Sequence, residues 1–159
     1  MVSFGSTADH KIGASGLLAV CGAIATLICL YAADWWPEPD SRGRGFLDSA
    51  QQVTSLRAPD AGSALQRAFL DWGHYLLATS VALTTIAVLT GRHRAAVVGA
   101  VTSVAGIGWM EWALALPGFG GTDWTRYLAG IGVGMLTVAV VARIAGDRNV
   151  IRSRSGRRA

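Results

Sequence analysis

Two acids and a histidine of this 159-residue chain, Asp71, Glu111 and His74, occur within long apolar runs. Glu111 lies between Trp109 and Trp112, and His74 follows Asp71 by one turn of a helix. Ionisable groups inside a membrane are costly, and they usually pair with one another or carry function. Because both segments reach the same side of the predicted membrane, we expect Asp71, His74 and Glu111 to form one polar cluster near the outer helix ends.

Three roles are open to such a cluster. A hydrogen-bonded knot between two helices is favoured over proton relay or ligand binding, because membrane acids usually pair. A metal site is disfavoured, since one His and two carboxylates show no dedicated ligand spacing. Haem is disfavoured because His10 and His93 lie outside the apolar runs and leave His74 without a second imidazole. Cys21 and Cys29 form no CxxC site, so we expect unreactive thiols and no cofactor.

The composition indicates that lipid surrounds most of the chain. Hydrophobic residues make up 52% and charged residues 15%, with a mean hydropathy of +0.40, whereas about a quarter of an ordinary soluble domain is charged. Four apolar runs are long enough to cross a membrane as helices. They cover residues 12–33, 69–90, 95–116 and 124–141. We therefore predict an all-α, polytopic membrane protein in which residues 1–159 form a single membrane domain.

The connections between these runs predict their neighbours. Only Gly-Arg-His-Arg, residues 91–94, separates the second run from the third, so these two helices should form an antiparallel hairpin. The outer segment 34–68 is the longest connection. Within it, the apolar spacing of residues 46–56 predicts a short amphipathic helix on the membrane or the bundle. After Pro59, a capped helix should run directly into the second span.

The distribution of basic residues predicts that both termini are cytoplasmic. The termini and the hairpin turn together carry nine Lys and Arg against two Asp, whereas the opposite side carries five Arg against seven Asp and Glu. Basic groups are retained on the cytoplasmic side. The Ala, Gly and Arg bias is typical of a high-GC bacterium, so we expect the bacterial plasma membrane. The basic tail, residues 143–159, should contact anionic lipid rather than nucleic acid.

Two further patterns predict contact surfaces. The tryptophans gather at the outer ends of the four runs. They are Trp35, Trp36, Trp72, Trp109, Trp112 and Trp124. Interfacial anchoring explains such a belt, and an aromatic surface for a partner or an amphiphilic ligand is the alternative. Gly130 and Gly134, four residues apart in the fourth run, permit close helix contact within the bundle or with another subunit.

The packing patterns in this sequence are clearer than the chemical ones. The chain has no Walker loop, nucleophile elbow, HExxH motif or nucleic-acid-binding motif. We therefore predict a non-catalytic accessory or structural subunit of a larger bacterial plasma-membrane complex, in electron transport or the cell envelope. Its partners would be other membrane subunits and lipid. The alternative is a small oligomeric transporter or ligand-binding membrane protein that uses Glu111 and His74.

Overall fold

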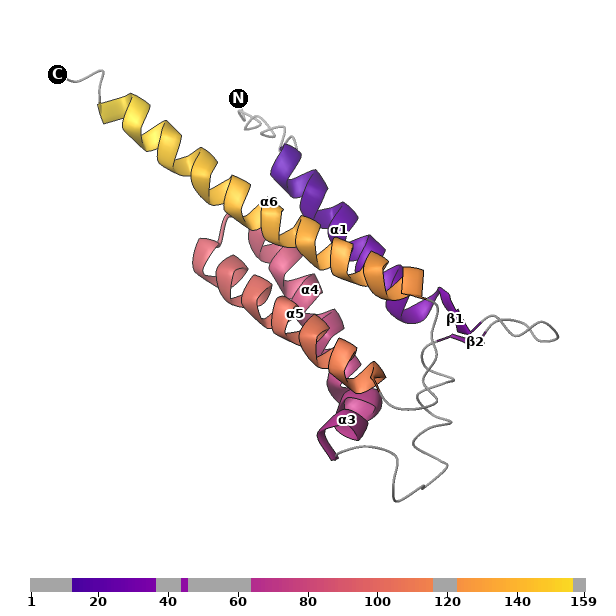
Figure 1. The fold of residues 1–159 in the computed structure, drawn as a ribbon. Helices are drawn as coiled ribbons and strands as arrows, with labels where there is room; N and C mark the ends of the chain where they lie inside the picture. Colours follow the sequence, from indigo (N-terminus) through magenta and orange to yellow (C-terminus); the bar gives the residue numbers. More distant parts are fainter. Residues whose placement is uncertain (1–12, 37–43, 46–63, 116–122, 156–159) are drawn as a thin grey trace, which may run out of the picture.

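The computed structural model describes residues 13–36, 44–45, 64–115 and 123–155, and nearly all of these are helical (Figure 1). The helices are α1 (Ala14–Tyr31), α3 (Ala64–Ala68), the π-helix η1 (Phe69–Gly73), α4 (His74–Leu89), α5 (His93–Leu114) and α6 (Asp123–Ser155). Since α3, η1 and α4 follow one another without a break, they form one continuous rod. The bundle therefore consists of four rods.

Each rod contains a segment that is long and apolar enough to cross a membrane, as the sequence predicts. These segments are Ala14–Tyr31, Ala64–Leu89, His93–Leu114 and Trp124–Asp147. The helix expected after Pro59 does run directly into the second span, from Ala64 onward. The fourth helix continues well past the predicted residue 141 to Ser155. No proline interrupts this extension, and arginines, which favour helix, recur along it.

The four rods are arranged as two packed pairs. α1 lies along α6 and α4 lies along α5, while further contacts join α5 to α6 and α1 to α4. The start of α1, the α4–α5 turn and the later part of α6 lie at one end, the hairpin end (Figure 1). The other end, with the C-terminus of α1 and the start of α6, carries Trp72, Trp109, Trp112 and Trp124. We call it the tryptophan end.

Glycines bring the backbones of α1 and α6 into direct contact. A Cβ atom placed on Gly22 would lie 2.5 Å from the carbonyl oxygen of Gly132, and one on Gly132 would lie 2.7 Å from that of Gly22. Thr26 donates its hydroxyl to the Gly22 carbonyl at 2.9 Å. By contrast, a Cβ on Gly130 or Gly134 would meet nothing within 4 Å. The predicted pair of glycines is therefore not the pair used inside the bundle.

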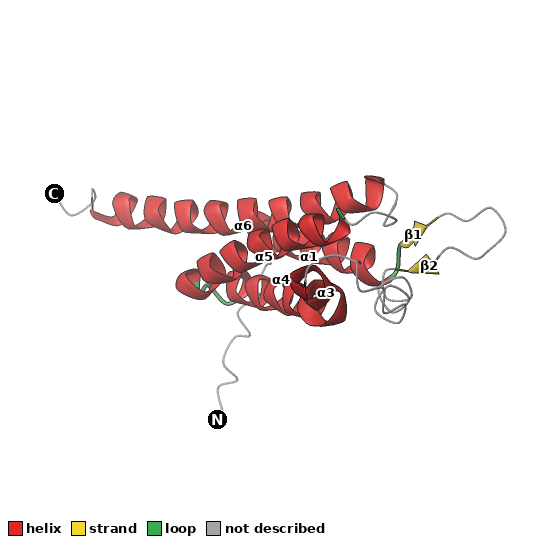
Figure 2. Ribbon diagram, turned by 60° about the horizontal axis from the view of Figure 1, so that its bottom comes forward, coloured by secondary structure: helices red, strands yellow, loops and turns green. Residues whose placement is uncertain are grey.

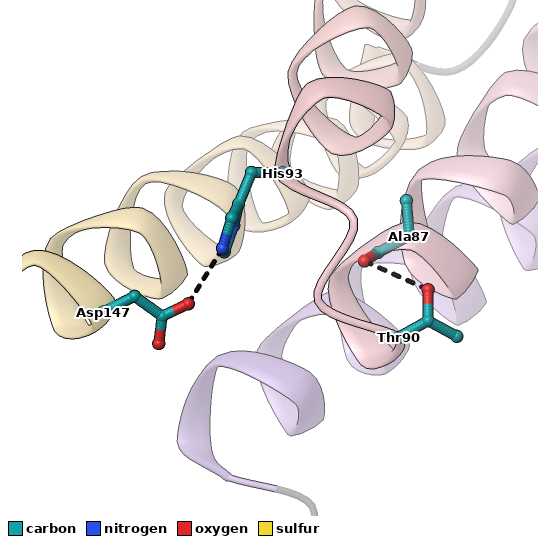
Figure 3. A network of polar contacts seen from close by, with 4 residues as sticks. All are labelled: Ala87, Thr90, His93 and Asp147. Atoms are coloured by element: carbon teal, nitrogen blue, oxygen red, sulfur yellow. Dashed lines mark hydrogen bonds and ion pairs between the residues drawn. The ribbon is translucent and has the colours of Figure 1, made fainter.

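The α4–α5 hairpin turn is shorter than the predicted residues 91–94. Gly91 has φ 70°, a left-handed conformation that glycine adopts without strain, and α5 already begins at His93. Thr90 donates its hydroxyl to carbonyls of the preceding turn, including that of Ala87 at 3.4 Å (Figure 3). His93 Nε2 lies 2.9 Å from Asp147 Oδ2 of α6 (Figure 3). His93 is thus a helical residue that links α5 to α6.

The segment after α1 contributes a short β ladder. β1 (Asp34–Trp36) pairs antiparallel with β2 (Arg44–Gly45), and the ladder lies beyond the tryptophan end of the helices (Figures 1 and 2). Sequence reasoning missed this pairing. The predicted amphipathic helix at 46–56 lies outside the described residues, as do the side chains of Trp35 and Trp36.

Candidate functional site

The π-helix η1 is the main irregularity of the described helices, and it lies at the predicted cluster. In η1 the backbone N–H of His74 donates to the carbonyl of Phe69, five residues earlier. The His74 ring Nδ1 also lies 3.3 Å from that carbonyl oxygen. Single π turns inside α-helices occur frequently at functional sites. This turn therefore marks the tryptophan end of the second rod as the candidate site.

Close packing around Gly73 accounts for the shape of this turn. A Cβ on Gly73 would lie 2.8 Å from the ring of Phe69 and 3.2 Å from the ring of Trp109. Gly73 therefore leaves the space into which α5 inserts the Trp109 indole. The wider π turn and the absence of a side chain at this position together accommodate a large aromatic ring between two helices.

His74 faces the first helix. Its side chain is buried, with 2% of its surface exposed. The Tyr75 ring lies 4.0 Å from the imidazole between centroids, and the Tyr31 ring of α1 approaches edge-on at 6.2 Å. The Tyr31 hydroxyl donates to the His74 carbonyl at 3.4 Å. His74 thus belongs to the contact between α4 and α1.

The two predicted carboxylates lie on the surface of the bundle. Asp71 is exposed on η1 and Glu111 is exposed on α5. Met110 and Ala113, which flank Glu111 on α5, face the core, so the helical rotation turns Glu111 outward. The structure brings the three residues to the same end of the bundle, with Asp71 and Glu111 on its surface and His74 in its interior, and their joining in one cluster stays a prediction.

Trp109 fastens the second and third rods together at this end. Its ring makes edge contacts with Phe69 and Trp72, each at 5.4 Å between ring centroids. Its indole N–H donates to the Leu65 carbonyl at 3.0 Å. In the opposite direction, Gln66 Nε2 donates to a backbone carbonyl of α5 at 3.0 Å. Sequence reasoning placed Trp72 and Trp109 in the belt but had no signal that they pack on each other.

The remaining tryptophans whose side chains are described point outward. Trp112 is 45% exposed and Trp124 is 56% exposed. Arg126, one turn after the start of α6, donates Nη2 to the Leu114 carbonyl at 2.8 Å. A cation at this position stabilises the C-terminus of α5. The tryptophan end is therefore fastened internally by Trp109 and Arg126 while it presents other aromatic rings to its surroundings.

An apolar groove of about 290 Å³ runs between α5 and α6 toward the hairpin end. Four residues of each helix line it: Val97, Ala100, Val101 and Val104 from α5, and Thr137, Val140, Val141 and Ile144 from α6. In the part of the chain that the structure describes, no group of three or more His, Cys, Asp or Glu side chains is placed to hold a metal ion. The described surfaces are suited to packing against apolar partners.

The chain was compared with protein families, curated proteins and solved structures. No family model, curated protein or solved structure matches it.

Proposed function

We propose that this chain is a non-catalytic subunit of a larger assembly in the bacterial plasma membrane, with both termini in the cytoplasm. The observation that carries the proposal is the contrast between a closely packed interior and an outer surface with exposed aromatic rings, open glycines and a carboxylate. The tryptophan end then lies outside the cell, and electron-transport and cell-envelope complexes are the candidate assemblies.

The buried polar groups of the bundle support a structural interior. Thr26, Thr84, Thr85 and Ser103 each donate a hydroxyl to the carbonyl four residues earlier on their own helix. Each of these hydroxyls already donates a hydrogen bond within its own helix, so it does not require an acceptor on a bound substrate. A Cβ on Gly99 would overlap the Thr84 hydroxyl, so α4 and α5 also pack without spare room at that level.

The exposed surface at the tryptophan end supports contact with other proteins. Trp112, Trp124 and Tyr127 are all substantially exposed, and Tyr127 is 70% exposed. Trp and Tyr favour membrane interfaces, and they are also enriched at protein contacts, where a large ring is buried and its polar edge finds a partner. Glu111 lies on the same end of α5, and a carboxylate near lipid gains from a donor on a neighbouring subunit.

Purification in mild detergent, followed by identification of stoichiometric companions, tests the proposal. Trp112→Ala and Trp124→Ala should weaken retention of a companion, because each removes an exposed ring and leaves the internal hydrogen bonds unchanged. Leu83→Ala is the matched control, since Leu83 is 59% exposed on α4, away from this end. Purification of the chain alone, under conditions in which other membrane complexes stay intact, would contradict the proposal.

The second candidate function is a small oligomeric transporter or ligand-binding protein that uses Glu111 and His74. The π turn that precedes His74 favours it, because such turns recur at functional sites. Comparison of Glu111→Gln with Glu111→Leu separates the two candidates. A transporter should lose activity with Gln while it keeps its expression and assembly, whereas a structural subunit should tolerate Gln and assemble poorly with Leu.

A further inference from the structure

We infer that the outward side of the α5–α6 pair is a self-association surface, and that its occupant is a second copy of this chain. This α5–α6 face runs from Val97 to Glu111 on α5 and from Tyr127 to Ile144 on α6. The inference rests on the membrane insertion proposed above, and it adds a specific partner. From the hairpin end to the tryptophan end, the face consists of an apolar groove, a stretch of open glycines and a charged part.

The part nearest the hairpin end is hollow and apolar. It is the groove of about 290 Å³ between α5 and α6, whose lining consists of valines, alanine, isoleucine and one threonine. The Thr137 hydroxyl donates to the Val133 carbonyl on its own helix at 2.9 Å, so it is already satisfied. A groove of this kind accepts apolar side chains from a neighbouring helix without leaving polar groups unpaired.

The middle part exposes helix backbone. Following the groove along each helix in steps of three or four residues leads to Gly108 on α5 and to Gly134 and Gly130 on α6. A Cβ placed on any of these three would meet nothing within 4 Å. Packing inside the bundle therefore gives no reason for glycine here, although glycine in a helix costs about 1 kcal/mol relative to alanine. Close approach by another helix gives a reason, because small residues let two backbones touch in lipid.

The part at the tryptophan end is complementary to itself in charge. Glu111 lies three residues before the end of α5, and Arg126 lies three residues after the start of α6, so both lie about 4.5 Å below the same helix ends. Glu111 is exposed and makes no ion pair within the described residues. Arg126 is half-buried, and its guanidinium brings a positive charge to this level while Nη2 donates to the Leu114 carbonyl at 2.8 Å. Beside it, Tyr127 is 70% exposed.

In a dimer whose two-fold axis lies along the membrane normal, the contact between Glu111 and the other copy would occur twice. Such an axis keeps every residue at its own depth, so α5 of one copy meets α6 of the other, as a self-complementary contact requires. Each Glu111 then reaches the level of Arg126 and Tyr127 of the second copy. A lipid tail would fill the groove but would bring no donor to the carboxylate. The second copy supplies the donors and the open glycines together.

Two differently tagged copies of the full chain, produced together and purified through one tag, test the inference. The second tag should be retained, and Gly134→Leu should reduce its retention about tenfold, because a large side chain separates the two backbones. Leu83→Ala, on an exposed position of α4, should leave retention unchanged. If neither tag retains the other in detergent or in lipid nanodiscs, the inference is wrong.

Disulfide cross-linking locates the contact without a bulky substitution. In a background without the two native cysteines, Gly108→Cys on one tagged copy and Gly130→Cys on the other should cross-link, because these positions lie at nearly the same depth. Cysteine is small, and both sites are open, so the fold should tolerate it. Leu76→Cys in place of Gly108→Cys is the control, because Leu76 is 52% exposed on α4 and its neighbour Leu77 lies against Gly106, close to the depth of Gly108. Cross-linking of the control alone would place the contact on another face and overturn the inference.

The other occupants give distinct results in the same purification. A single copy that retains lipid, and loses it with Gly134→Leu, overturns the inference in favour of lipid. A single copy that retains a different subunit also overturns it but leaves the proposed function standing. A pair of copies without any companion supports the self-association surface and counts against the larger assembly.

Discussion

The contact between α1 and α6 allows a stability prediction whose size follows from the structure. In Gly132→Ala the new methyl group would lie 2.7 Å from the Gly22 carbonyl oxygen and 2.9 Å from the Thr26 amide nitrogen. Both of these atoms belong to the backbone of α1, so no side chain can turn aside to make room. The two helices must move apart by several tenths of an ångström to reach ordinary contact.

We expect this separation to lower the free energy of unfolding by roughly 1–3 kcal/mol, the usual range for overpacking a close-packed interior. Gly146→Ala is the matched control, because a Cβ at Gly146 meets nothing within 4 Å and the position lies on the same helix. The control should be neutral or should gain up to about 1 kcal/mol from helix propensity. The two variants should therefore differ by about 1–4 kcal/mol.

Unfolding in detergent micelles with increasing denaturant, followed by circular dichroism, measures this difference. Equal yields of the two purified variants would not show equal stability, because a small loss of stability need not lower expression. If Gly132→Ala proves as stable as Gly146→Ala, the backbones of α1 and α6 are not in close contact.

Two further predictions concern individual contacts, and a third concerns the membrane topology. Trp109→Phe should keep the aromatic packing but lose one hydrogen bond between α5 and α3, so unfolding free energy should fall by about 1 kcal/mol; a loss above about 3 kcal/mol would show that a Phe ring cannot fill the site. His93→Ala should cost less than about 1 kcal/mol, because the pair with Asp147 is exposed, and a larger shift in melting would contradict this. Cysteine reporters at Ser55 and Ser155, in a chain without native cysteines, should react from opposite sides of the membrane, with Ser55 outside; the reverse pattern would invert the proposed topology.

The helices of this protein could be predicted from sequence because the signal for each is local. A run of about 20 apolar residues is sufficient to indicate a helix of membrane-spanning length, and four helices long and apolar enough to cross a membrane occur close to the predicted positions. The short turn at Gly91 likewise predicted that α4 and α5 are neighbours. The pairing of α1 with α6 had no such signal, because more than 90 residues separate the two helices and several of their faces carry small residues.

At the candidate site, the level of a residue along the bundle is easier to predict than the direction in which its side chain points around the helix. Counting residues from the helix ends correctly places His74 and Glu111 at the same end of the bundle. Each residue step turns the side chain by about 100° around the helix, so the direction depends on how neighbouring helices rotate as they pack. The same rotation selects Gly132 for the internal contact and leaves Gly130 and Gly134 outside. No pattern within the sequence GIGVG distinguishes these glycines.

The packing of α1 on α6 has a consequence for how the protein is made. Synthesis produces α1 before α4, α5 and α6, yet α1 and α6 are each other's principal neighbours. Once α5 has been made, the α4–α5 hairpin can pair, whereas the Gly22 surface of α1 has no matching backbone until α6 follows. In the membrane arrangement proposed above, the Gly22 surface of α1 would stay covered by lipid or by the insertion machinery until Gly132 arrives. A chain that stops before α6 would contain a paired hairpin beside an unmatched helix, the kind of product that membrane quality control removes.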